Sequence, residues 1–354
     1  MSKRISDGLL RLVTQRCNSY LLPGSIREKC SDFYIGRHRV GTIRADHLKE
    51  LLQYRDTFTI RDQTTGSIQL NESESSLDST RQRGVTESLD STRRVTESLD
   101  STRHVTESLD STRRVTESLD SYKHRTQRVN DVLLDLKQKS KLEALNGWRN
   151  EFYEVWANDR RCSLMKIERA AACIFGIRTY GVHINGYVNH STEGLCVWTA
   201  RRSPTKPTYP NKLDQMVAGG LTAGLTVLDC ARKECGEEAS IPEQFLNKLK
   251  HVGCVSYCYE ASRGIVPGVE YCFDLELPQS FTPHNSDGEV ADFQLLPVQS
   301  LLSKMITDEF RANAALVNLD FLIRHGIITP DNEPNYAMLV EWMHTTPCLP
   351  SERV

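Results

Sequence analysis

Residues 216–241 read Met216-Val-Ala-Gly-Gly-Leu-Thr-Ala-Gly-Leu-Thr-Val-Leu-Asp-Cys-Ala-Arg-Lys-Glu-Cys-Gly-Glu-Glu-Ala-Ser-Ile241. Glycines at 219, 220 and 224 predict a loop, because glycine adopts backbone conformations that other residues avoid. After the loop, apolar side chains recur at helical spacing. This predicts a helix over residues 227–238 with Leu228, Ala231 and Cys235 on one face.

Three carboxylates crowd the neighbouring face of this helix. Glu234, Glu237 and Glu238 are spaced i, i+3 and i+4, so they repel one another unless a positive charge lies among them. A solvated acidic face is one interpretation. The adjacent glycine loop favours another, since carboxylates beside exposed backbone carbonyls suit a hard cation such as Mg²⁺ or Mn²⁺ that also binds substrate phosphates.

The elements on both sides of this stretch predict a mixed α/β domain over residues 161–335. Alternating apolar residues predict strands at 180–184, 195–199, 255–259 and 271–277. A helix is expected at 308–325, where Gly326 would end it. Residues 336–354 are expected to form a C-terminal tail.

A small α+β domain is expected over residues 1–160, beginning with a basic helix and followed at 33–43 by a strand, a turn and a strand. Residues 73–118 form an insertion in which a ten-residue unit recurs from Val85. Each copy carries two apolar residues, which cannot offset the entropy of ordering the segment, so disorder is predicted. A helical or solenoid-like stack is the alternative.

Charge and cysteine content limit the partners and the compartment. The 44 Lys and Arg residues against 46 Asp and Glu exclude polyanion binding by charge alone, so neither nucleic acid nor a membrane is expected as a partner. Eleven cysteines without a CxxC pair favour reduced thiols in the cytoplasm. The basic N-terminus leaves a mitochondrial presequence as the alternative. The oligomeric state is not determined.

Residues 219–241 resemble the Nudix box of diphosphate hydrolases, and all three core glutamates are present. That pattern is a Gly, five residues, a Glu, seven residues, then Arg-Glu-apolar-any-Glu-Glu-any-Gly-apolar. In this chain Leu225 replaces the early Glu, Lys233 the Arg and Ser240 the second Gly. Lys233 keeps the charge without the forked guanidinium. Ser240 would have to adopt a left-handed conformation, at a cost of roughly 1 kcal/mol.

Other segments resemble one Nudix subfamily, which fungi fuse to thiamine pyrophosphokinase and plants carry as chloroplast Nudix hydrolases. The segments are 163–172, 175–188, 202–210, 212–214, 255–257, 271–278, 287–290 and 321–326. This resemblance implies an α/β/α Nudix sandwich with a mixed sheet, preceded by the small α+β domain.

The resemblance also implies a hydrolase in which water attacks phosphorus in a small-molecule diphosphate. The catalytic residues it implies are Glu234, Glu237, Glu238 and Lys233. The metal ligands it implies, for Mg²⁺ or Mn²⁺, are Gly219, Glu234, Glu237, Glu238 and Glu289. The substrate-binding residues are Lys206, Lys212 and Asp214.

Simpler interpretations remain for some of these residues. Lys206 and Lys212 could be solvated loop lysines, Glu289 part of a loop turn, and His183 a structural histidine. The subfamily implies thiamine diphosphate, or its oxidised and damaged analogues, as the substrate, with the monophosphate and phosphate as products. Two alternatives are an oxidised nucleoside diphosphate as the substrate, and a non-catalytic binding or scaffold protein. The number of bound metals is open, because Leu225 replaces a potential ligand.

Overall fold

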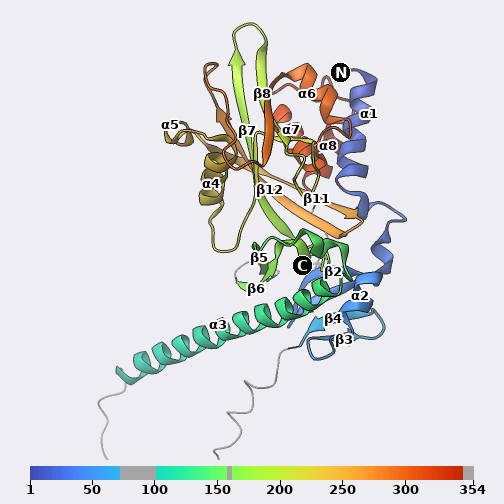
Figure 1. Cartoon of the computed structure of the whole chain (residues 1–354), viewed down its shortest axis with the longest axis vertical. Coiled ribbons are helices and arrows are strands. Elements are labelled where there is room, and N and C mark those ends of the chain that lie inside the picture. Colours follow the sequence, from blue (N-terminus) through green and yellow to red (C-terminus); the bar gives the residue numbers. More distant parts are fainter. Residues whose placement is uncertain (72–100, 158–161, 346–354) are drawn as a thin grey trace, which may run out of the picture.

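The computed structural model describes residues 1–71, 101–157 and 162–345, with side chains described outside 101–119. A smaller body that contains the long helix α3 (Ser101–Gln138) lies against a larger body built on a seven-stranded sheet (Figure 1).

The smaller body begins with a four-stranded sheet of order β2-β1-β4-β3. Its strands are β1 (Cys30–Ile35), β2 (His38–Arg44), β3 (Phe58–Asp62) and β4 (Ser67–Leu70), and helix α2 (Ala45–Leu51) follows β2. The predicted strand, turn and strand at 33–43 are confirmed by the antiparallel pair β1 and β2. At the centre of this body, the ring centroids of Phe33, Phe58 and Phe175 lie 5.1 to 6.1 Å apart.

The core of the smaller body extends past the predicted boundary at residue 160. Strand β5 (Phe152–Trp156) pairs antiparallel with β6 (Ser163–Glu168), and the short helices η6 (Glu143–Gly147) and η7 (Arg169–Ala171) flank the pair. The same apolar core includes residues up to Ile177. A boundary at residue 160 would separate two paired strands. We therefore place the boundary after Ile177, where this core ends.

Helix α3 corrects part of the prediction for the repeat. Residues 72–100 lie outside the described residues, but 101–118, which were predicted to be disordered, form the first half of α3. The second half is anchored in the core by Val129, Val132, Leu133 and Leu136, all at most 5% exposed. Once a helix is nucleated there, each further residue adds a backbone hydrogen bond, which favours its extension into the repeat.

The larger body is built on a mixed sheet of order β11-β12-β7-β8-β13. Its strands are β7 (Thr179–His190), β8 (Gly194–Arg202), β9 (Leu213–Gln215), β10 (Val217–Gly220), β11 (Lys250–Ala261), β12 (Gly264–Glu276) and β13 (Val290–Pro297). β12 and β7 are parallel, whereas the other pairs are antiparallel. Two short strands lie off this order: β10 pairs with β7, and β9 pairs with β8.

Helices cover both faces of this sheet (Figure 1). On one face are α4 (Val227–Ala239) and α5 (Glu243–Leu246), and α4 packs Ala231 and Cys235 against Val182 and Ile184 of β7. On the other face are α1 (Lys3–Arg11), α6 (Val298–Met305), α7 (Ala312–Arg324) and α8 (Tyr336–Met343). The predicted α/β/α sandwich is confirmed.

The N-terminal residues and the described C-terminal residues up to 345 belong to the larger body, which corrects two predicted domain assignments. The expected N-terminal helix α1, with the π-helical turn η1 (Leu12–Arg16), packs on the helices of the C-terminal half. The Ser6 hydroxyl donates a hydrogen bond to Glu333 at 2.6 Å. Of the predicted tail, residues 336–343 form α8, in which Leu339 is fully buried. The short helices η2 (Ser19–Leu21) and η3 (Ile26–Lys29) then lead to β1.

Three smaller predictions also differ from the structure. Gly219 and Gly220 lie in strand β10 and not in a loop. Leu228, predicted on the buried face of α4, is 47% exposed. Helix α7 begins at Ala312 and not at residue 308.

No helix within the described ranges is both long and apolar enough to cross a membrane.

The end of α4 confirms the expected conformation of Ser240. Its φ of 49° and ψ of 42° place it in the left-handed region. In this conformation the Ser240 and Ile241 amides donate to the carbonyls of Gly236 and Cys235, which closes the helix end.

Ser240→Gly should therefore stabilise the protein by about 0.5–1 kcal/mol, because glycine adopts this conformation without a Cβ clash. Ser303→Gly, at an exposed position inside α6, is the matched control and should destabilise by a similar amount. Urea unfolding of both variants measures the two effects. A loss of stability for Ser240→Gly would contradict the assigned strain.

Candidate active site

Helix α4 places two glutamates against strand β10. Thr226 caps the helix, with its hydroxyl oxygen accepting from the Asp229 amide at 3.1 Å. Ala231 and Cys235 are fully buried against the sheet. Glu234 precedes Cys235 by one residue, and Glu238 follows it by three. Both side chains therefore project from α4 towards the adjacent edge of the sheet, where β10 lies.

The Glu238 carboxylate is buried at the outer edge of β10. Glu238 is 6% exposed, and its Oε2 accepts a hydrogen bond from the Ala218 amide at 2.8 Å. Burial raises the pKa of Glu238, and the nearby charges of Glu234 and Asp214 raise it further. This carboxylate is therefore held where its negative charge is poorly solvated.

The Glu234 carboxylate lies against the backbone of the next residue of β10. Its side chain is 15% exposed, and a Cβ at Gly219 would overlap it. Burial also raises the pKa of Glu234, with Glu237 contributing in the same direction. Because Gly219 has no side chain, the Glu234 carboxylate can occupy this space.

Lys233 bridges two of the predicted ligands. Its Nζ donates to Glu237 Oε2 at 2.6 Å and to Glu234 Oε1 at 3.3 Å. A single ammonium therefore contacts both carboxylates, although lysine lacks the fork of the arginine in the Nudix pattern. Glu237 is half exposed, so it is the most accessible of the three glutamates.

Lys206 and Glu289 meet beside this cluster and form an ion pair. The Lys206 side chain is 13% exposed. Burial lowers the pKa of Lys206, with Arg202 acting in the same direction and Glu238 in the opposite one. The loop lysine predicted to bind phosphate is therefore partly desolvated and close to the acidic cluster.

Asp214 lies close enough to Glu238 to raise its pKa, but the Asp214 carboxylate is already paired within the fold. Asp214 is 3% exposed and accepts 2.9 Å hydrogen bonds from both Arg202 and Arg311, so its carboxylate has no open side for an anionic substrate. These two guanidiniums hold the pKa of Asp214 well below its usual range. Lys212 contributes its carbonyl to the Arg202 amide. In the structure Asp214 is thus a buried counter-ion of two arginines, and Lys212 stays a predicted substrate-binding residue.

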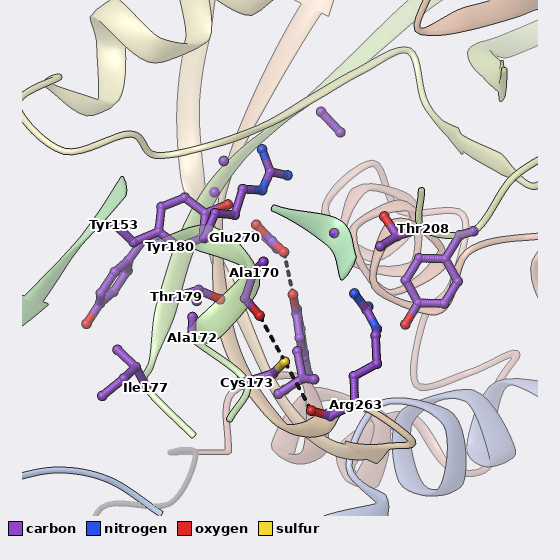
Figure 2. Close-up of a pocket in the computed structure, with 18 of the residues that line it drawn as sticks. Tyr153, Ala170, Ala172, Cys173, Ile177, Thr179, Tyr180, Thr208, Arg263 and Glu270 are labelled. Atoms are coloured by element: carbon purple, nitrogen blue, oxygen red, sulfur yellow. Dashed lines mark hydrogen bonds between the residues drawn. The ribbon is translucent and has the colours of Figure 1, made fainter. Parts of the chain in front are cut away.

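A pocket of about 150 Å³ adjoins β10 and lies between the two bodies. The smaller body contributes Arg149, Tyr153 and Arg169, and the larger body contributes His183 and the β10 residues Ala218 to Gly220. Figure 2 shows Tyr153 and Tyr180 on one side of this pocket, and Thr208 and Arg263 on the other.

The smaller body also holds the loop that leads into α4. Glu151 accepts from Arg169 at 2.7 Å and from the Thr222 hydroxyl at 2.9 Å. The Ala223 amide donates to the carbonyl of Phe152 at 2.8 Å. Sequence reasoning treated 148–153 as a segment joining two domains and missed these contacts, because no motif marks them.

His183 is buried, as expected for a structural histidine, but only part of its ring is paired. Its Nε2 lies 3.6 Å from Glu270, while Nδ1 has no hydrogen-bond partner among the described residues. Burial lowers the pKa of His183, so the ring is neutral near pH 7.

The acidic cluster fits a divalent cation in its chemistry. No group of three or more His, Cys, Asp or Glu side chains in the described ranges is already arranged as a metal site. Two carboxylates with raised pKa values, Glu234 and Glu238, nevertheless lie against adjacent residues of β10, and Gly219 leaves room for one of them. A hard cation would stabilise the ionised forms of both carboxylates beyond the contact that Glu234 makes with Lys233.

Comparisons with known proteins agree with this geometry. Residues 180–316 match the NUDIX domain, and 9–107 and 92–179 match a domain of unknown function, DUF4743. An uncharacterized protein of Saccharomyces cerevisiae is 41% identical over 62% of this chain and 68% of its own length. The chain thus carries a NUDIX domain at residues 180–316, preceded by the DUF4743 region. The predicted Nudix domain and fold class are confirmed, whereas the thiamine-pyrophosphokinase-related subfamily stays a prediction.

Two Arabidopsis thaliana proteins, Nudix hydrolase 20 and Nudix hydrolase 24, both chloroplastic, are 41% and 40% identical over 63% of this Nudix chain. The match spans 59% and 60% of their lengths. A crystal structure of a Deinococcus radiodurans protein aligns with 48% of this chain and 98% of its own, at 21% identity and a TM-score of 0.35.

Gly219→Ala should destabilise the protein by about 1–3 kcal/mol, because the added methyl group overlaps the Glu234 carboxylate. Gly236→Ala, inside α4 with open space around it, is the control and should stabilise by up to about 1 kcal/mol. Chemical denaturation compares the two. Equal stability for both variants would show that Glu234 does not occupy the space beside Gly219.

Proposed function

We propose that this Nudix protein is a metal-dependent diphosphate hydrolase. The observation that supports this proposal most is a pair of carboxylates beside β10, the buried Glu238 and the partly buried Glu234, next to a pocket rich in arginine and tyrosine. The carboxylates suit a cation, and the pocket suits an anionic organic molecule, so the two together match a diphosphate ester and its metal.

The acidic residues would hold the cation. Glu237 and Glu238 would be ligands, Glu234 a further ligand or the base, and the Gly219 carbonyl and Glu289 would complete the set. A bound Mg²⁺ or Mn²⁺ would neutralise the diphosphate and lower the pKa of the attacking water.

The chain's own groups would then perform the remaining tasks. Glu234, with its raised pKa, can accept the proton of the attacking water. The water oxygen forms a bond to the terminal phosphorus, the bridging P–O bond breaks, and the monophosphate leaves with that oxygen. Lys233 would keep Glu234 and Glu237 in position, and Lys206 would bind a phosphate oxygen when it exchanges its contact with Glu289.

For the substrate we propose thiamine diphosphate or its oxidised and damaged analogues, which would be cleaved to the monophosphate and phosphate. The subfamily resemblance supports this choice. The pocket is compatible with it, because Tyr153 and Tyr180 offer aromatic surface to a planar heterocycle. A panel of diphosphates that includes thiamine and oxidised nucleoside diphosphates, scored for Mg²⁺-dependent phosphate release, identifies the substrate.

Glu237→Gln should reduce Mg²⁺-dependent phosphate release by at least about 100-fold, because it removes one ligand charge at an accessible position without changing side-chain size. Glu243→Gln is the matched control: Glu243 is an exposed glutamate that pairs with Arg232 on the surface, and its loss should leave the rate unchanged.

The same assay separates the enzyme from a scaffold protein. For a non-catalytic scaffold, Mg²⁺ would neither support hydrolysis of any diphosphate in the panel nor raise the melting temperature of the wild-type chain. Turnover by Glu237→Gln at the wild-type rate would likewise reject the catalytic assignment.

A further inference from the structure

The pocket between the two bodies carries more positive than negative charge. Among its lining residues, Arg169 pairs with Glu151 and Arg311 pairs with Asp214. The guanidiniums of Arg149 and Arg263 have no hydrogen bond or carboxylate partner within the described part of the chain.

The one carboxylate that lines the pocket in the described ranges is already engaged. Glu270 Oε1 accepts hydrogen bonds from Tyr257 at 2.7 Å and from Asn313 at 2.9 Å. The pocket therefore has uncompensated cationic groups around a polar space, which is an arrangement that favours an anionic ligand.

Arg149 is anchored through its backbone, while its side chain has no partner among the residues that the structure describes. The Arg149 amide donates to Glu168 Oε1 at 3.0 Å, and Glu168 is 1% exposed. The next residue, Asn150, has a φ of 58°, which turns the chain before β5. The half-buried guanidinium is thus held at the pocket by a rigid segment of the smaller body. Burial and the neighbouring charge of Arg169 lower the pKa of Arg149 to about 10, so it stays cationic near pH 7.

Strand β10 lies beside both the pocket and the acidic cluster. Ala218 and Gly219 line the pocket, and the same two residues contact Glu238 and Glu234. The two sites are therefore neighbours that share one strand, although the glutamates themselves do not line the pocket. In the pocket, His183 Nδ1, buried and without a partner among the described residues, offers a further hydrogen-bonding group.

We propose that Arg149, supplied by the smaller body, binds a phosphate oxygen of the substrate, so that the inter-body pocket and the Nudix cluster form one diphosphate site. This inference rests on the proposed function for the identity of the substrate. It gives the DUF4743 region a direct part in recognition, by a guanidinium that donates two parallel hydrogen bonds to phosphate.

The test compares Arg149→Met, which keeps the length of the side chain but removes its charge, with Arg149→Lys, which restores the charge. Arg37→Met is the control, since Arg37 is an exposed arginine in the turn between β1 and β2 of the same body. The probe is inorganic diphosphate, titrated calorimetrically into the full-length chain in metal-free buffer. Thermal melting of each variant verifies folding.

We expect Arg149→Met to weaken binding of inorganic diphosphate by about tenfold or more, Arg149→Lys to recover part of the affinity, and Arg37→Met to match the wild type. With the substrate found in the panel, Arg149→Met should raise KM by a similar factor and change kcat little. Unaltered affinity and KM in a folded Arg149→Met variant would overturn the inference.

The binding measurement also separates this inference from the proposed hydrolysis. If no diphosphate in the panel is hydrolysed while the wild type binds inorganic diphosphate through Arg149, the hydrolase assignment fails and the binding site stands. If hydrolysis proceeds but Arg149→Met behaves as the wild type, the site assignment fails and the hydrolase stands.

Discussion

The confinement of two carboxylates against the backbone of β10 is the constraint on which the site depends. Helix α4 is attached to the sheet through Ala231 and Cys235, so Glu234 and Glu238 cannot turn away into solvent. Burial is the main cause of the raised pKa of both carboxylates, and a neighbouring negative charge acts in the same direction, Glu237 on Glu234 and Glu234 on Glu238. Such a strained electrostatic arrangement is typical of a site whose charge balance is completed by a cation and an anionic substrate.

The smaller body contributes to the same site in two physical ways. Glu151 and the Phe152 carbonyl hold the loop before α4 in place, which limits the freedom of the helix start. Arg149 and Tyr153 come from the same short segment and line the pocket beside β10. The smaller body, which the DUF4743 model matches in large part, therefore lines one side of the pocket between the two bodies, next to the residues that would surround a substrate.

Several local features were predictable because short-range physics decides them. The helix over 227–238 follows from its apolar spacing, and the left-handed Ser240 follows from the need to end that helix with two backbone hydrogen bonds. Other predictions failed where long-range contacts prevail. Gly219 and Gly220 extend into a strand because β7 offers them backbone partners. Part of the repeat is helical because the buried end of α3 nucleates it.

The sequence by itself determined the family, the acidic helix and the order of elements, since each depends on residues close together along the chain. Only the tertiary structure decided which charges meet. Asp214 looks like a substrate ligand in sequence, but Arg311, which lies 97 positions away, neutralises it. Arg149 has no recognisable motif and becomes a phosphate-binding candidate only because folding places it at the pocket without a carboxylate partner in the described chain. Charge pairing depends on distances through space, which spacing along the chain does not encode.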